Sequence, residues 1–278
     1  MRYISVQNMM SAIYKSINQL QKMNIGLVVG IPRSGMLPAN IIALQLNVPF
    51  TDIDSFMSGR IYGMGARQQY VQTKSNNVLV IDDSISSGHA INLARQKLKT
   101  ITGFHIYYGA IFARTASKKL VDFYADIVDG NRIFEWHLFH NQVILSKSCV
   151  DIDGVLCNDP TPKENDDGAN YKNFLTNATP KFIPTVTIGA LVTCRLEKYR
   201  AETTEWLSKH NIKYNKLIMM NLPNAQARQA WGKYGEFKAM EFGKPEYIFC
   251  IESSLREATR IKELTHKMVF CTETMNVV

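Results

Sequence analysis

The sequence lacks the features that mark membrane, secreted or disulfide-bonded proteins. No window approaches ~18 uninterrupted apolar residues, so we expect no transmembrane helix. The first residues, MRYISVQNMM, contain no basic segment followed by an apolar one, so we expect no secretory signal. The five cysteines are an odd number, all lie in the second half, and none has CxxC spacing. These absences predict reduced thiols in a cytoplasmic chain.

Linkers, repeats and clustered charge are absent as well. The 278 residues contain no Pro- or Gly-rich linker, internal repeat or low-complexity tract, and they are enough for two domains. The formal charge of +8 is spread along the chain, with only short groups such as Lys118-Lys119. This scatter disfavours a nucleic-acid partner, whereas a generally positive surface suits phosphorylated substrates.

Apolar strand patterns alternate with helical patterns along the whole chain. Apolar spacing predicts a helix over residues 5–21, with Ser5 as its cap. Strands are predicted in the first half at IGLVVGI, NVLVID and HIYYGAIFA, and in the second half at SCVDIDGVL, TIGALVTC, YNKLIMM, PEYIFCIES and HKMVFCT. This alternation favours parallel sheets covered on both faces. We expect an α/β protein of two doubly wound parallel-sheet domains, residues 1–145 and 146–278.

The stretch VLVIDDSISSGHAI places Asp82 and Asp83 at the end of an apolar strand. Two adjacent carboxylates cannot both face a core unpaired, so at least one must meet solvent, a cation or hydrogen-bond donors. Ser86, Ser87 and Gly88 follow, and their amides and hydroxyls can surround a phosphate at the strand end. The carboxylates are then placed to hold ribose hydroxyls or Mg²⁺. From this window alone, a strand-to-helix turn with Asp and Ser as caps is the alternative.

A second loop, in VVGIPRSGMLPA, also joins a predicted strand to a predicted helix. Gly30 and Gly35 allow close backbone approach, and Arg33 supplies a cation for a bound anion. Together the two stretches resemble the pyrophosphate loop and the phosphoribosyl-pyrophosphate motif of type I phosphoribosyltransferases. The resemblance covers about the first 140 residues. It implies phosphoribosyl pyrophosphate as substrate and, by analogy with dimeric members of the family, a homodimer.

The resemblance also assigns roles to individual residues. Asp82 and Asp83 would hold the ribose hydroxyls, and Arg33, Ser34 and Gly35 would contact the pyrophosphate with Mg²⁺. The 5-phosphate would be bound by Ser86, Ser87, Gly88, His89 and Ala90, although many members have Gly or Thr where His89 stands. The family has a mobile loop between the two motifs. Here SGRIYGMGARQQY would supply it with Arg60 and Arg67, and an exposed hairpin is the alternative.

The acceptor that would receive the ribose is left open by the sequence. We find no clear base-recognition hood. The aromatic stretch IFEWHLFHN falls where the first predicted domain ends, and it contains Glu135, Trp136, His137 and His140. These side chains would line an acceptor site, or the stretch packs between the domains.

The stretch CVDIDGVLC gives the second half its own pair of carboxylates. Asp151 ends a predicted strand and Asp153 follows two residues later, so the two side chains can converge on one face. Gly154 permits a tight turn after them. This spacing suits a nucleophile and a general acid/base, with the negative charge offset by Mg²⁺. A calcium loop is the competing metal site, but its other ligands are missing from the sequence.

This stretch resembles the first motif of the haloacid dehalogenase superfamily in its phosphatase form. Three further motifs follow in order, in LVTCR, GEFKAMEF and YIFCIESS: Thr193, then Lys238 with Lys216 and Lys244 as alternatives, then Glu252 and Ser253. The resemblance implies that Asp151 forms an aspartyl-phosphate, and that Asp153 protonates the leaving group and then activates water. The Mg²⁺ ligands would be Asp151, Asp153, Glu252 and Ser253. Fewer than 40 residues separate the first two motifs, so any cap domain inserted between them is small.

The two resemblances together predict a bifunctional enzyme. One domain would transfer ribose 5-phosphate from phosphoribosyl pyrophosphate to an acceptor, and the other would remove the 5-phosphate. A glycan or lipid carrier suits this order of reactions, because base salvage normally retains the phosphate. Two alternatives remain. One is a nucleobase phosphoribosyltransferase of nucleotide salvage with an attached nucleotide phosphatase, and the other is a nucleic-acid-binding regulator that senses phosphoribosyl pyrophosphate.

Overall fold

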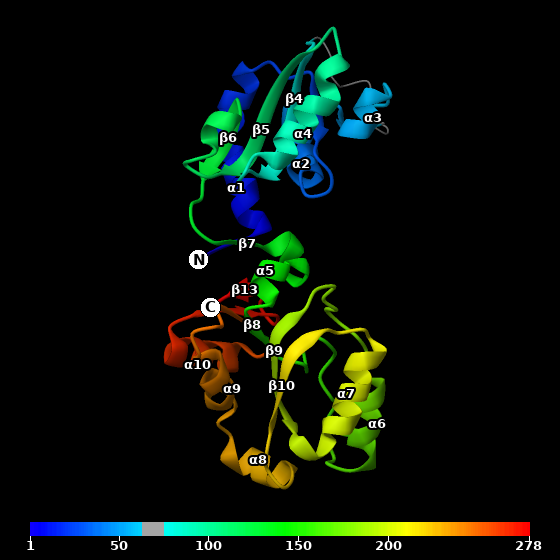
Figure 1. The fold of residues 1–278 in the computed structure, drawn as a ribbon, viewed down its shortest axis with the longest axis vertical. Coiled ribbons are helices and arrows are strands. Elements are labelled where there is room, and N and C mark those ends of the chain that lie inside the picture. The colour runs from blue at the N-terminus through cyan, green and yellow to red at the C-terminus, as the bar shows by residue number, and fades with distance from the viewer. Residues whose placement is uncertain (63–74) are drawn as a thin grey trace. The chain divides into compact units, whose positions relative to one another are not determined.

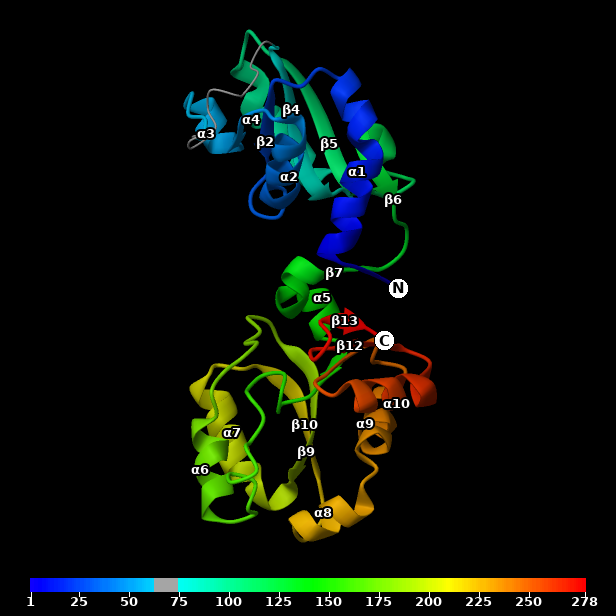
Figure 2. The same ribbon diagram turned by 180° about the vertical axis from the view of Figure 1, so that it is seen from behind.

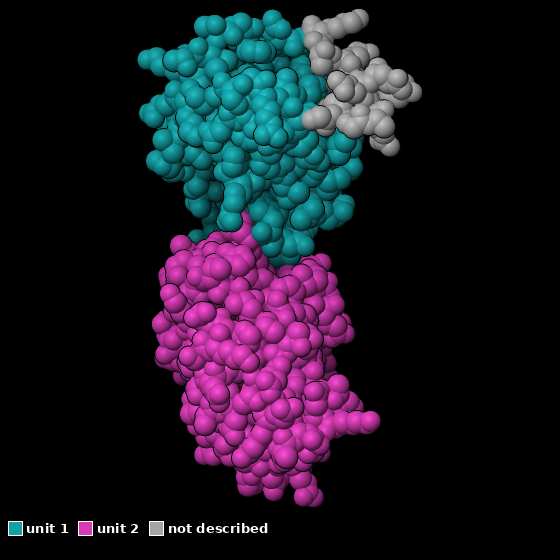
Figure 3. Space-filling model, turned by 90° about the vertical axis from the view of Figure 1, so that its right-hand side faces the viewer, with its two compact units in different colours: residues 1–136 teal, residues 137–278 magenta. Residues whose placement is uncertain are grey.

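A computed structural model describes residues 1–62 and 75–278 of the chain. The chain divides into two compact units, Met1–Trp136 and His137–Val278, which Figure 3 shows in different colours. The division comes before the predicted boundary, so residues 137–145 group with the second unit. None of the helices in the described ranges is long and apolar enough to cross a membrane. All five cysteines are free, and four of them are buried, as small core residues are expected to be.

The first unit is built around a five-stranded parallel sheet with the strand order β3-β2-β4-β5-β6. The strands of this unit are β1 (Arg2–Ile4), β2 (Leu27–Gly30), β3 (Phe50–Asp52), β4 (Asn77–Ser84), β5 (His105–Ala113), β6 (Phe123–Ile127) and β7 (Arg132–Phe134). Its α-helices are α1 (Val6–Lys22), α2 (Met36–Leu46), α3 (Ile53–Met57) and α4 (His89–Lys97). The strands predicted at NVLVID and HIYYGAIFA are confirmed as β4 and β5.

The two faces of this sheet bury two separate clusters of apolar side chains. Leu79 and Ile81 of β4 belong to the cluster covered by α1 and α2, and Val78 and Val80 to the cluster covered by α3 and α4. This alternation follows from the two-residue period of a strand. Figure 1 shows the helices on the two sides of the sheet. Helices on both faces leave the carboxyl ends of the strands as the open edge of the unit.

Residues far apart in sequence fix the start of α1. Ser5 caps the helix by accepting from the Asn8 amide at 3.1 Å, which confirms the predicted cap. The Glu135 carboxylate also accepts from the Val6 amide at 2.7 Å. Next to this contact, β1 and β7 form a two-stranded parallel sheet that the sequence patterns did not predict, because each strand has only three residues. Glu135 therefore serves the first turn of α1.

The second unit contains a six-stranded sheet with the order β10-β9-β8-β11-β12-β13, parallel except for the last strand. Its strands are β8 (Ser148–Val150), β9 (Ile188–Leu196), β10 (Tyr214–Met220), β11 (Phe249–Glu252), β12 (Met268–Cys271) and β13 (Asn276–Val277). Its α-helices are α5 (Gln142–Leu145), α6 (Ala169–Asn177), α7 (Arg200–Lys209), α8 (Ala225–Trp231), α9 (Tyr234–Phe242) and α10 (Leu255–Thr265). The five strands predicted in this half are confirmed.

The second sheet also carries helices on both sides. Figure 2 shows α6 and α7 on one side of β9 and β10, and α9 and α10 on the other. Phe242 and Ile261 pack against the sheet from α9 and α10. The two units are thus mixed α/β structures with parallel sheets. In each, a pair of aspartates lies at the carboxyl end of a strand near the middle of the sheet: Asp82 and Asp83 in β4, and Asp151 and Asp153 just after β8.

Candidate functional site

The loop after β4 encloses a cavity of about 260 Å³ at the carboxyl end of the first sheet. Six of the predicted residues line it: Asp82, Ser86, Ser87, Gly88, His89 and Ala90. Gly88 caps α4 with a φ of +81°, and a Cβ there would lie 2.8 Å from the Leu120 side chain. A larger residue would therefore strain this turn. The Ile85 carbonyl accepts from Ser117 Oγ and Arg132 Nη2, which fixes the first part of the loop.

Asp82 and Asp83 are both buried but differ in their surroundings. The Trp136 indole N–H donates to Asp83 Oδ2 at 2.7 Å, whereas the Asp82 carboxyl accepts from the Asp83 amide at 2.8 Å and also interacts with the Asp83 carboxyl. Burial, and then the negative charge of Asp83, raises the pKa of Asp82 to about 8. Asp82 lines the cavity, and Asp83 is held away from it. The structure thus gives the two carboxyls different environments.

The loop after β2 lies beside the Asp82 loop because β2 and β4 are neighbouring parallel strands. The Ile31 amide donates to the Ile81 carbonyl at 2.9 Å, directly before Asp82. Gly35 is packed so closely that a Cβ would lie 2.6 Å from that same carbonyl. The peptide bond between Pro32 and Arg33 is cis, and Arg33 is exposed. The two predicted loops therefore meet at one edge of the sheet, with Ser34 between Arg33 and the buried Gly35.

Only part of the predicted loop between the two motifs is described. The Arg60 backbone is fixed, since its amide donates to the Ser55 carbonyl at 2.8 Å and its carbonyl accepts from Thr51 Oγ1. Tyr62 donates its hydroxyl proton to Asp52. The Arg60 side chain is exposed. Arg67 lies outside the described residues.

The aromatic stretch at 133–141 is divided between the units. Trp136, the last residue of the first unit, stacks on Phe134 with ring centroids 4.8 Å apart while it donates to Asp83. His137 and His140 belong to the second unit, where His140 Nδ1 lies 3.0 Å from Thr185 Oγ1. Trp136 is thus a direct partner of a motif residue, which neither interpretation from the sequence had included.

A buried lysine organises the aspartates of the second unit. Lys238 is 4% exposed, and its ammonium lies 2.7 Å from Asp151 Oδ2, 2.7 Å from Glu252 Oε2 and 2.8 Å from Glu257 Oε2. Burial opposes its charge, but Asp151 and Glu252 raise the pKa of Lys238 well above its usual value. Lys216 and Lys244 pair with Glu241 instead. Lys238 is therefore the lysine placed beside the aspartates.

Asp153 is held by a second buried cation, Arg195, which is fully buried. Its guanidinium donates to both carboxylate oxygens of Asp153, with Nη2–Oδ1 at 2.6 Å and Nε–Oδ2 at 3.1 Å. Such a two-point contact fixes the orientation of the carboxylate. Gly154 follows with a φ of +72°, and a Cβ there would lie 2.4 Å from Ser253. The turn therefore requires glycine and brings Asp153 close to the end of β11.

These groups open onto a cavity of about 300 Å³, which we call the carboxylate cavity. Five of the predicted residues line it: Asp151, Asp153, Thr193, Lys238 and Ser253. Glu252 is 1% exposed and is not a lining residue. It is connected to the cavity through Lys238, which donates to its carboxylate. Ser253 Oγ donates to Glu252 Oε1 at 3.3 Å. The four motifs of the second half thus meet at the carboxyl ends of β8, β9 and β11 and at α9.

The charges around the carboxylate cavity leave an excess of negative charge. The lining residues and their ion-pair partners include five carboxylates and three cations: Asp151, Asp153, Asp159, Glu252 and Glu257 against Lys238, Arg195 and Arg228. Burial, with the charges of Glu252 and Asp153, raises the pKa of Asp151 against the opposing charge of Lys238. Within the described ranges, however, no three carboxylate, imidazole or thiol groups converge as ligands. The Lys238 ammonium stands between Asp151 and Glu252, so Mg²⁺ would have to use oxygens on the cavity side.

Several residues of this site were missed by the sequence reasoning. Arg195 could have been found, because it lies two residues after Thr193 on the same face of β9. Arg228 could not, since α8 was not predicted. It donates to Asn165 Oδ1 at 3.2 Å and to the Cys194 carbonyl at 3.3 Å, at the rim of the cavity. Glu257 follows the fourth motif on α10, and no sequence signal distinguishes it from the other glutamates of that helix.

Comparison with protein families matches residues 3–147 to the family described as "Phosphoribosyl transferase domain". The match covers just over half of the chain. It contains both loops at the edge of the first sheet and the whole aromatic stretch at 133–141.

Three solved structures match part of the chain at low identity. A purine phosphoribosyltransferase from Pyrococcus horikoshii matches at 16% identity over 49% of this chain and 93% of its own, with a TM-score of 0.38. A xanthine-guanine-hypoxanthine phosphoribosyltransferase from Helicobacter pylori matches at 16% over 49% and 92%, with a TM-score of 0.37. An orotate phosphoribosyltransferase from Aeropyrum pernix matches at 14% over 44% and 70%, with a TM-score of 0.32. These scores are too low to carry a conclusion about substrates.

Replacing Asp82 by asparagine should stabilise the protein more as pH rises. The pKa of Asp82 is raised from 3.8 to about 8, so the folded state keeps a proton that the unfolded chain releases. Wild-type stability therefore falls between these two pH values, and Asp82→Asn escapes the loss, which amounts to about 5 kcal/mol at pH 8. Urea unfolding at pH 4.5 and pH 8 measures this difference, with the exposed Asp54→Asn as control. An equal effect of Asp82→Asn at both pH values would contradict the assignment.

Replacing Trp136 by phenylalanine should destabilise the first unit. Phenylalanine keeps an aromatic ring against Phe134 but cannot donate to the buried Asp83 carboxylate. Loss of one donor to a buried charged group costs about 1–3 kcal/mol. Urea unfolding of Trp136→Phe beside Trp231→Phe, which alters a partly exposed ring, measures the cost. Similar small losses in both variants would show that the bond to Asp83 contributes little.

Proposed function

This chain belongs to the phosphoribosyl transferase domain family, and from that premise we propose that it is a bifunctional enzyme of ribose transfer and phosphate removal. The first unit transfers ribose 5-phosphate from phosphoribosyl pyrophosphate to an acceptor. The second unit then hydrolyses the 5-phosphate in the manner of a haloacid dehalogenase phosphatase. The observation that carries the second step is the convergence of Asp151, Asp153, Thr193 and Lys238 on one cavity.

In the proposed transfer step, the C1–O bond to pyrophosphate breaks and a bond from C1 to the acceptor forms. Pyrophosphate leaves with the electron pair, so its growing charge must be neutralised while water is excluded. Arg33, Ser34 and Gly35 would contact the pyrophosphate, and the amides and hydroxyls of 86–90 would bind the 5-phosphate. Asp82 faces the cavity where the ribose hydroxyls would lie. At the same strand end, the Asp83 carboxylate accepts a hydrogen bond from Trp136.

In the proposed hydrolysis, a carboxylate oxygen of Asp151 attacks phosphorus and the bond to the ribose oxygen breaks. Asp153 gives a proton to the leaving alkoxide and then removes one from the water that hydrolyses the aspartyl-phosphate. Thr193 contacts the phosphoryl group, Lys238 balances its charge, and Arg195 keeps Asp153 in place. Mg²⁺, when bound, would offset the negative charge of phosphate and carboxylates together.

The proposal leaves the acceptor to be identified, and a glycan or lipid carrier is our choice. Removing the 5-phosphate is useful when ribose itself is the group to be delivered. It would be wasteful in base salvage, whose products are nucleotides. Consumption of orotate, adenine, guanine or hypoxanthine as fast as any glycan would replace this choice with the nucleobase alternative.

The Asp151→Asn variant should trap the intermediate between the two steps. Wild type, Asp151→Asn and the surface control Asp54→Asn are each incubated with Mg²⁺, phosphoribosyl pyrophosphate and an extract of glycans and small molecules. Mass spectrometry should find an acceptor carrying phosphoribosyl with Asp151→Asn, and the same acceptor carrying ribosyl with the other two. If all three proteins yield the phosphorylated product, the second step is wrong. Binding of the donor without consumption would instead indicate a sensor.

A matched pair of lysine variants tests the proposed cation of the second step. Lys238→Met should lower kcat for p-nitrophenyl phosphate by at least about 100-fold, because a buried charge that faces the phosphoryl group is lost. Lys244→Met, on a half-exposed lysine that pairs with Glu241, should stay within about twofold of wild type. Circular dichroism checks that both variants fold. Equal losses in the two variants, or none in either, would remove Lys238 from the mechanism.

A further inference from the structure

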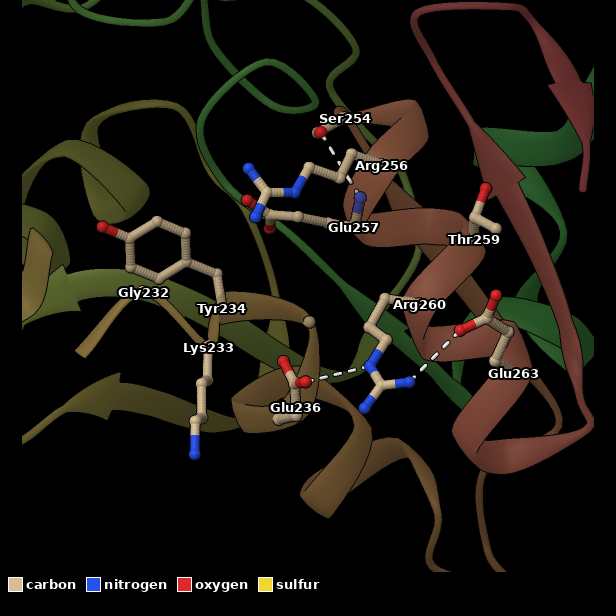
Figure 4. Close-up of a pocket in the computed structure, with 11 residues that line it drawn as sticks. Gly232, Lys233, Tyr234, Glu236, Ser254, Arg256, Glu257, Thr259, Arg260 and Glu263 are labelled. Atoms are coloured by element: carbon tan, nitrogen blue, oxygen red, sulfur yellow. Dashed lines mark hydrogen bonds and ion pairs between the residues drawn. The ribbon is translucent and has the colours of Figure 1, made fainter. Parts of the chain in front are cut away.

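A second cavity lies next to the carboxylate cavity in the second unit. It has a volume of about 530 Å³ and lies between the amino-terminal part of α9 and the helix α10, as Figure 4 shows. We call it the α9–α10 groove. Its size is within the usual range for small-molecule sites and exceeds that of the carboxylate cavity itself.

The α9–α10 groove and the carboxylate cavity share part of their lining. Tyr234, Ser254 and Glu257 line both spaces. The Glu257 carboxylate is engaged by Lys238 at 2.8 Å, and the Ser254 hydroxyl accepts from the Glu257 amide at 3.4 Å. These shared side chains are thus fixed. A ligand whose phosphate lies at Asp151 could extend past Tyr234 into the groove.

The charges in the groove are unevenly paired. Arg260 is neutralised, with Nε 2.9 Å from Glu236 Oε1 and Nη1 3.2 Å from Glu263 Oε2. Arg256 has no hydrogen-bond or ion-pair partner within residues 1–62 and 75–278. In Figure 4 its guanidinium extends from α10 toward the side of the groove where Tyr234 lies. Lys233 and Arg256 are thus the two exposed cations of the groove without a partner in the described ranges, and Arg256, with its five donors, is the one that reaches toward Tyr234.

We propose that the α9–α10 groove is a subsite for a second anionic group on the substrate of the phosphatase step, and that Arg256 binds that group. This inference rests on the proposed phosphatase function of the second unit. The planar guanidinium of Arg256 would donate to two phosphoryl oxygens, and Tyr234 would pack against the sugar between the two anions. The preferred substrate is then a sugar 5-phosphate that carries a second phosphoryl group on the oxygen of its anomeric carbon. An acceptor that itself ends in phosphate would produce such a molecule in the transfer step.

Two sugar phosphates that differ only in the second anion provide the test. Ribose 5-phosphate and ribose 1,5-bisphosphate are offered to wild type, Arg256→Ala, Arg256→Lys and the control Lys262→Ala, which removes an exposed charge from the same helix outside the groove. Wild type and Lys262→Ala should prefer the bisphosphate by at least about tenfold in kcat/KM and release ribose 1-phosphate. Arg256→Ala should lose the preference, and Arg256→Lys should recover part of it.

The outcomes separate this inference from the function on which it rests. Equal kcat/KM for the two sugars in wild type, or a preference that survives in Arg256→Ala, overturns the subsite while leaving the phosphatase intact. If no phosphate ester is hydrolysed by wild type, the phosphatase proposal fails. Calorimetric binding of ribose 1,5-bisphosphate to Asp151→Asn, with and without Arg256→Ala, then decides the subsite alone. At least tenfold weaker binding in the double variant supports it, and equal binding overturns it.

Discussion

Buried negative charge at the ends of parallel strands is the constraint on which both candidate sites depend. Each sheet places an aspartate pair where its strand leaves the core, so carboxylates are taken out of water in a place that also faces a cavity. Burying an ionised carboxylate is costly unless it is paired or protonated.

The two units meet this constraint in different ways. In the first, no cation of the described residues forms a salt bridge with the pair; Asp83 accepts from the Trp136 N–H, and the pKa of Asp82 rises to about 8. In the second, Lys238 and Arg195 are buried with the carboxylates and bind them directly. The first arrangement leaves a carboxyl ready to meet a neutral sugar or a cation. The second builds a fixed set of charges, which suits a reaction that needs a nucleophile and a proton carrier in place.

These differences are consistent with the two proposed chemical steps, which need different arrangements of charge. A transferase must recognise a large, flexible, highly charged donor and can gain its charge balance from that donor and its metal. A phosphatase must hold an attacking oxygen and a proton donor before the substrate arrives. The paired cations in the second unit would provide that preorganisation for the phosphatase step that we propose. Arg256 differs from these cations, because no carboxylate among the described residues forms an ion pair with it, whereas Arg260 is paired.

The amino-acid sequence by itself determined the elements that carry chemistry. Strand periodicity, the Ser5 cap and the short motifs placed Asp82, Asp83, Asp151, Asp153 and Thr193 at strand ends, because these signals are local. Only the tertiary structure decided which lysine faces Asp151, that Trp136 binds Asp83, that Glu135 accepts from the first turn of α1, and that Arg256 has no partner among the described residues. Those contacts join residues up to 129 positions apart, and their energies depend on burial that no local pattern encodes.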